Sequence, residues 1–199
     1  MAVELLRQLF TVDQYYKMQD AGVFTGNERV ELIRGEIIKM SPMGIRHSAC
    51  VKRLAELFIL RLAQTITVGI QDSVRLNNTS EPQPDISLLQ RRSDFYETQQ
   101  PQPENVFLLI EVSDTTIKYD REIKIPLYAE NNIVEVWLVN LTEECLEVYR
   151  QPTANGYEIV QTFQRGETLT IQALPNVTFT VDEILGADTD LATDVRIDF

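Results

Sequence analysis

The spacing of apolar residues changes several times along the chain, and each change predicts a different element. The longest helical pattern runs from Ile45 to about Gln64, where apolar residues recur at helical spacing and fill most of the second half. A shorter helix is predicted over residues 11–21, because Thr11 is a suitable N-cap and Gly22 a suitable end. Both helices have a face that can pack on a core.

Two further segments contain residues that turn or break the chain. The apolar-rich runs 30–34 and 36–40 meet at a glycine and predict a β-hairpin. A second long helix is predicted over about 119–130, but Pro126 lacks a backbone N–H and cannot lie deep inside a regular helix. We therefore expect this helix to start close to Ile123 or to be kinked.

Apolar runs between the helices predict the strands of a sheet. Residues 106–112 are apolar apart from one glutamate, which is typical of a strand buried on both faces. Further strands are predicted over 66–76, 86–89 and 134–139. From residue 45 onward the order is helix, strand, strand, strand, helix, strand, which predicts an α/β fold with a mixed central sheet flanked by helices.

The chain after Asn140 is predicted to form an antiparallel β meander, divided by prolines and glycines. Its strands are expected at 145–150, 157–163, 168–172 and 177–180. We expect a single domain over residues 1–199, with a core at about 45–140, a C-terminal β addition at 141–186 and a loosely held acidic tail at 187–199.

Composition and charge restrict the class of protein. The chain has 199 residues, and no apolar run approaches the roughly 18 residues that a membrane span requires. No secretory signal is recognisable, and Cys50 and Cys145 are too few for a disulfide framework, so we expect a cytoplasmic protein with reduced thiols and no membrane partner. The net charge of −12 argues against a nucleic-acid binder driven by overall charge. However, residues 141–199 hold 3 basic and 11 acidic residues, whereas 46–61 has a net charge of +3.

Two carboxylates lie in apolar strand sequence, where an ionised group is costly unless it is paired or bound to a cation. Glu111 is near the end of the run 106–112, and Asp85 follows a proline just before the strand 86–89. Their separation of 26 positions allows adjacent strands to bring both groups together. Two hard oxygen ligands favour Mg²⁺ over Zn²⁺, and a single histidine with two distant cysteines argues against zinc or iron.

A series of short motifs resembles the Uma2 family, a group of restriction-endonuclease-like proteins abundant in cyanobacteria. The resemblance covers roughly residues 10–185, and although each motif alone is weak, their order and spacing together are specific. The motifs are Glu31-Leu32-Ile33-Arg34-Gly35-Glu36, Ser41-Pro42, His47, Pro84-Asp85, Glu111-Val112-Ser113, Asp120, Lys124-Ile125-Pro126-Leu127-Tyr128 and Glu135-Val136-Trp137-Leu138-Val139.

This resemblance implies the PD-(D/E)XK nuclease fold and a Mg²⁺-dependent endonuclease acting on DNA, with Mn²⁺ as the second candidate metal. Asp85 and Glu111 match the metal-binding acids, and the backbone carbonyl of Val112 matches a further ligand. The lysine expected two residues after Glu111 is replaced by Ser113. In this family the lysine has moved to the following helix, where Lys124 matches it and would assist the attacking water.

Three more residues are candidates for the same site. Glu31, or alternatively Glu36, would add a carboxylate to the metal site, unless these glutamates face solvent in the predicted hairpin. His47 would contact a phosphate or carry a proton, unless it caps a neighbouring loop. Asp120 is expected first to pair with Lys124, four residues away, and otherwise to lie over the site. Tyr128 shares the helix face of Lys124 but is expected to be a packing residue.

Each main assignment has a structural alternative. Asp85 after a proline is also typical of a turn with an Asx hydrogen bond, and Glu111 can be a strand-end carboxylate that reaches solvent. Lys124 alone is more typical of a solvated helix position.

Two other function classes stay open. One is a catalytically inactive nuclease-fold protein that binds nucleic acid or regulates another protein. The other is a protein-interaction module that uses the acidic C-terminal meander. For the nuclease we expect DNA as the substrate and a homodimer, since two copies can cut both strands.

Overall fold

The computed structural model describes residues 7–24 and 28–186, which form an α/β fold around a mixed six-stranded sheet. The strand order is β3-β4-β5-β6-β7-β8; β5 and β6 are parallel and every other neighbouring pair is antiparallel. The helices and turns are α1 (Val12–Asp20), α2 (Ile45–Leu62), η1 (Pro103–Asn105), α3 (Ile117–Tyr119), η2 (Asp120–Lys124), α4 (Ile125–Glu130) and α5 (Val181–Leu185). The strands are β1 (Val30–Ile33), β2 (Glu36–Lys39), β3 (Ile66–Ile70), β4 (Ile86–Gln90), β5 (Val106–Ser113), β6 (Glu135–Asn140), β7 (Cys145–Thr153), β8 (Gly156–Phe163), β9 (Thr168–Ile171) and β10 (Leu174–Thr180).

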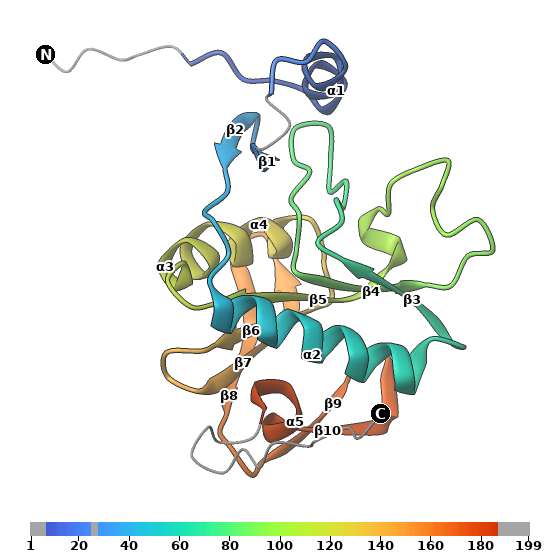
Figure 1. Ribbon diagram of the computed structural model, residues 1–199, viewed down its shortest axis with the longest axis vertical. Helices are drawn as coiled ribbons and strands as arrows, with labels where there is room; N and C mark the ends of the chain where they lie inside the picture. The colour runs from blue at the N-terminus through green and yellow to red at the C-terminus, as the bar shows by residue number, and fades with distance from the viewer. Residues whose placement is uncertain (1–6, 25–27, 187–199) are drawn as a thin grey trace, which may run out of the picture.

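Helices cover both faces of the sheet, as the apolar character of the two central strands requires. All six residues of β6 are buried, and so is every residue of β5 except half-buried Phe107. On one face α2, α5 and the β9–β10 hairpin form a core around Phe58, Trp137 and Phe179. On the other face α4 packs through Leu127 and its neighbours. Figure 1 shows α2 crossing the sheet, with α1 and the β1–β2 hairpin at one end of the molecule.

The N-terminal elements form as their sequence predicts. The side chain of Thr11 accepts from the backbone N–H of Gln14, whose side chain accepts from the N–H of Thr11, and this capping box starts α1. Gly35 turns the β1–β2 hairpin at φ +80°, and a Cβ there would lie only 2.8 Å from the Cβ of Leu9. The hairpin is fixed to a distant loop by the reciprocal backbone bonds of Leu32 and Glu81.

The predicted bounds of one strand and one helix need correction. The strand predicted over 66–76 ends at Ile70, because Gln71 has a left-handed conformation (φ +55°) and the chain leaves the sheet there. The helix predicted over 119–130 starts at Ile117 and contains a π-helical turn just before Pro126. This turn removes the need for the regular hydrogen bond that proline cannot donate.

The C-terminal strands do not form one meander. β7 and β8 extend the central sheet, while β9 and β10 form a separate antiparallel hairpin on the α2 face. The acidic tail predicted from Ala187 lies outside the described residues. Across residues 7–24 and 28–186, no helix is both long and apolar enough to cross a membrane.

Candidate active site

Asp85 and Glu111 lie next to each other at one edge of the sheet, although 26 positions separate them in the sequence. The antiparallel register pairs Ile86 with Ile110, so Asp85 just before β4 lies opposite Glu111 near the end of β5. The two acids are directly linked through the backbone, because the N–H of Val112 donates to Asp85 Oδ2 at 2.9 Å. Both carboxylates are buried. The expected convergence of these acids is therefore present.

Asp85 is held as a carboxylate by three donors. Besides the Val112 N–H, Gln71 Nε2 donates to Oδ1 at 3.0 Å and His47 Nε2 lies 3.0 Å from Oδ2. Burial acts to raise the pKa of Asp85, but the hydrogen bonds and the nearby His47 outweigh it and lower that pKa below its ordinary value. His47 therefore contacts Asp85 from the first turn of α2.

Glu111 forms a second buried network with Lys124. The Lys124 ammonium lies 3.1 Å from Glu111 Oε1 and 3.2 Å from Glu31 Oε2, and the Tyr128 hydroxyl also donates to Glu111. Glu31, Glu111 and Lys124 are only 2%, 3% and 4% exposed. The alternatives of a solvated lysine at position 124 and a solvent-facing glutamate at position 31 or 111 are therefore wrong. Tyr128 is a packing residue, as expected, and in addition a hydrogen-bond donor to the site.

Glu31 is fixed in this network by its own donors. Tyr119 donates its hydroxyl to Glu31 Oε1 at 3.1 Å, and the backbone N–H of Gln83 donates to Oε2 at the same distance. The hairpin that carries Glu31 therefore completes the environment of Lys124 from a segment far away in sequence.

Burial and surrounding charge set the protonation of the Lys124 network. Burial acts to lower the pKa of Lys124, but the charges of Glu111, Glu31, Asp120 and Asp85 outweigh it and raise that pKa, so the ammonium persists. Burial raises the pKa of Glu111 well above its ordinary value; Lys124 opposes this shift, and Asp120 and Asp85 add to it. Four buried carboxyl groups thus surround a single ammonium.

The direct pair expected between Asp120 and Lys124 is not formed: the ion pairs of the described residues join Lys124 to Glu31 and Glu111 instead. Asp120 accepts hydrogen bonds from the hydroxyls of Ser113 and Thr116. Both Asp120 and Lys124 belong to the π-helical turn and both are buried, so the turn directs its two ends toward the site. Ser113 therefore supports Asp120 at the position where the usual motif has lysine.

These residues line a cleft of about 500 Å³. Among its charged lining residues acids predominate, with five carboxyl groups against the side chains of Arg29, Lys39 and Lys124. The acids are Glu31, Asp85, Glu111, Asp114 and Asp120. Hard oxygen donors converging in a cleft are the chemistry that Mg²⁺ or Mn²⁺ prefers.

Sequence reasoning missed Gln71, Gln83 and Tyr119 as partners of the acidic groups. Gln71 follows the last residue of β3, and no local pattern distinguishes it from any other loop glutamine. Tyr119 carries a signal, because it immediately precedes the π-helical segment and lies five residues before Lys124.

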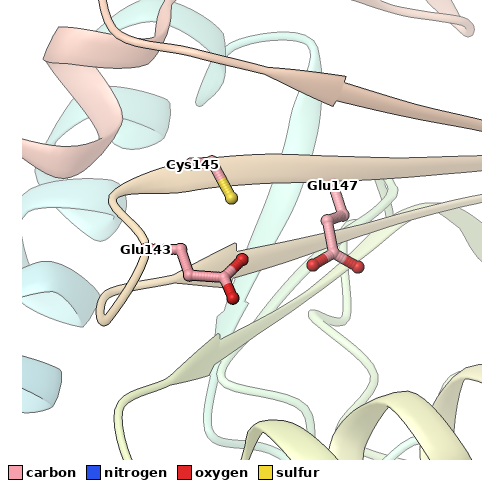
Figure 2. Close-up of side chains that lie close together, drawn as sticks. All are labelled: Glu143, Cys145 and Glu147. Carbon is pink, nitrogen blue, oxygen red and sulfur yellow. The ribbon is translucent and has the colours of Figure 1, made fainter.

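A second group of possible ligand atoms lies away from this cleft, on Glu143, Cys145 and Glu147 (Figure 2), with the three atoms within 4.8 Å of one another. Glu147 already accepts from Arg121 and from the Tyr149 hydroxyl. Burial raises the pKa of the Cys145 thiol, with a further contribution from Glu147. The carboxylate is balanced by the guanidinium, so this group needs no cation.

Comparisons with known proteins agree with this fold. The crystal structure of a protein described as a putative nuclease belonging to DUF820, from Anabaena variabilis, superposes with a TM-score of 0.66 at 15% identity. The match covers 88% of this chain and 97% of that one. No curated protein matches the sequence. The model of the Uma2 family, described as putative restriction endonucleases, matches residues 12–182, and the chain therefore belongs to the Uma2 family.

Proposed function

We propose that the protein is a Mg²⁺-dependent endonuclease that hydrolyses phosphodiester bonds in DNA. The observation that carries this proposal is the excess of buried carboxyl groups around a single ammonium, at the edge where Asp85 and Glu111 meet. Burying several carboxylates beside one ammonium costs free energy, and binding a divalent cation would reduce that cost. Membership of a nuclease family supports the same reaction class.

Asp85 and Glu111, with the backbone carbonyl of Val112, are the residues that would hold the metal, either Mg²⁺ or Mn²⁺. The donor set fits, because all three ligands are oxygens and the hydrogen bonds to Asp85 keep it ionised. When bound, the cation polarises a phosphodiester oxygen and lowers the pKa of the attacking water.

Lys124 is proposed to orient the attacking water and to stabilise negative charge that develops on the phosphate. An ammonium has three donors, and it lies 3.1 Å from Glu111 Oε1 and 3.2 Å from Glu31 Oε2. With one donor on each carboxylate holding the side chain in position, the third N–H is proposed to bind the attacking water. In-line attack then leaves a 5′-phosphate and a 3′-hydroxyl.

Glu31, His47 and Asp120 are proposed as positioning residues. Glu31 holds Lys124, and His47 holds Asp85. Asp120 adds negative charge that keeps Lys124 protonated. Two copies in a homodimer would place one such site on each strand of a duplex.

The test is a calorimetric titration with Mg²⁺ and Mn²⁺, on the parent protein and on Asp85→Asn and Glu111→Gln, followed by cleavage assays on plasmid DNA. We expect the parent to bind metal and nick DNA, and both variants to lose both properties with their circular dichroism spectra unchanged. An Asp85→Asn protein that cleaves DNA as fast as the parent contradicts the metal assignment. No metal binding by the parent, even with an oligonucleotide present, favours a catalytically inactive binding or interaction module.

A further inference from the structure

Arg29 lines the cleft but forms no ion pair with any residue that the structure describes. It lies immediately before β1, and its backbone carbonyl accepts from the N–H of Met40 at 2.9 Å, so the two ends of the hairpin hold it at the cleft wall. Among residues 7–24 and 28–186, its guanidinium has no ion pair and donates no side-chain hydrogen bond.

The two other cations that line the cleft, and Arg46 nearby, are already engaged. Lys39 pairs with Glu28 at 3.0 Å, and Lys124 pairs with two buried carboxylates. Arg46 donates to the backbone carbonyl of Leu141 at 2.6 Å and lies 3.4 Å from Asp114. An arginine left without a partner in a cleft rich in carboxylates is therefore unusual.

Arg29 also lies in the same cleft as the proposed metal site. Its side chain lines this cleft together with Asp85 and Glu111. A planar guanidinium presents several donors in a fixed arrangement that matches the oxygens of a phosphate. No described residue takes up these donors.

We propose that Arg29 binds a phosphate group of the nucleic-acid strand that enters the cleft, as a substrate-positioning residue. The inference rests on the proposed nuclease function. It assigns to the Arg29 guanidinium the attraction of a negatively charged nucleic-acid strand to a cleft that is otherwise rich in carboxylates. Without it, a phosphodiester would meet five carboxyl groups with only paired cations to offset them.

The experiment measures binding of a short fluorescein-labelled DNA duplex, and of the same sequence as RNA, by anisotropy in EDTA over a range of salt concentrations. We expect Arg29→Ala to lower the affinity by roughly tenfold and to reduce the slope of log K against log salt by about one, because one phosphate contact is lost. Arg29→Lys should keep the slope and lose part of the affinity. Lys17→Ala, which removes one exposed charge from α1, is the matched control and should change neither.

The outcomes separate this inference from the proposed function. If Arg29→Ala binds as the parent does, with the same salt slope, Arg29 is not a phosphate ligand, whereas cleavage and metal binding by the parent stand. If the parent binds neither DNA nor RNA even at low salt, the nucleic-acid substrate fails and the role of Arg29 fails with it. Calorimetric Mg²⁺ binding should be unchanged in Arg29→Ala; its loss would show that the substitution acts on the metal site and overturn the inference.

Discussion

Lys124 and Glu31 are joined by a buried ion pair of 3.2 Å, although one lies in a helical segment and the other in an N-terminal hairpin. Together with the pair between Lys124 and Glu111, this contact balances charge that cannot reach water. The stability of the fold and the chemistry of the site are therefore coupled through one ammonium.

Replacing Lys124 should damage both stability and activity. Lys124→Met leaves Glu31 and Glu111 buried without their cation, and loss of one partner of a buried pair typically costs about 3–5 kcal/mol. We expect urea denaturation to show a decrease of this size and DNA cleavage to be lost. Lys118→Ala is the control, because Lys118 is exposed on the same helical segment and should unfold at the parent's midpoint. Equal stability of Lys124→Met and the parent would contradict the described charge balance.

His47 should control metal affinity without touching the metal. His47→Ala removes one of the donors that hold Asp85, and loss of such a supporting partner typically weakens metal binding by about 10–100-fold. Calorimetry should show this decrease, with partial recovery in His47→Gln, whose amide can still donate. Lys52→Ala, on an exposed position of the same helix, should bind Mg²⁺ like the parent. Unchanged affinity in His47→Ala would remove His47 from the site.

The stability of the metal-free protein should decrease as the pH rises above the ordinary range of carboxyl groups. Burial raises the pKa of Glu111 and of Asp120 in the folded state, so folding favours their protonated forms. The stability that these two groups contribute is complete below their unfolded pKa values and is lost as the pH rises through the folded ones. Asp85 has the opposite effect on the pH dependence of stability. Its pKa is lowered in the folded state, so the stability that it contributes is lost only as the pH falls toward that lowered pKa.

Asp120→Asn isolates part of this effect. The amide oxygen can still accept from Ser113 and Thr116, while the charge is absent at every pH. Chemical denaturation in EDTA should be measured between about pH 4 and pH 8, the range in which carboxyl groups with raised pKa values titrate. The free energy of unfolding should change less with pH for Asp120→Asn than for the parent. A parallel profile would mean that Asp120 titrates alike in the folded and unfolded states.

Mg²⁺ should stabilise the folded protein, because the proposed metal site exists only where folding brings the carboxyl groups together. At a free concentration of about 100 times Kd, the expected gain is about 2.7 kcal/mol, seen as an increase in Tm. Asp85→Asn should show no such increase, and neither should the parent with Na⁺ at matched ionic strength. An equal increase in Asp85→Asn would place the bound cation elsewhere.

The sequence was most informative where a polar residue interrupts an apolar strand. Glu111 in β5 and Asp85 before β4 could be expected side by side, because each strand has a clear local pattern and the spacing leaves room for one connection between adjacent strands. Tyr128 could be placed on the face of Lys124 by helical spacing. The number of strands in the central sheet was less predictable. The alternation of apolar and polar residues in β7 and β8 is the same whether these strands extend the central sheet or form a separate one.

The burial of Glu31 could not be predicted, because it depends on contacts made after the chain has folded. Its hairpin pattern is equally consistent with a solvent-facing carboxylate, and only the docking of Leu32 against Glu81 directs it inward. The π-helical turn was also missed, since a five-residue departure from helical spacing leaves no trace except Pro126. Both features belong to the site, where local rules and the final fold most often disagree.

The β1–β2 hairpin supplies part of the proposed site from outside the predicted core. Residues 45–140 contain Asp85, Glu111 and Lys124, yet Glu31, a second counterion of Lys124, comes from the hairpin before them, and Arg29 lies immediately before that hairpin. A chain in which the hairpin has not docked has its acids in place but lacks half of the lysine's support. The proposed site is therefore complete only when the N-terminal hairpin is docked on the rest of the fold.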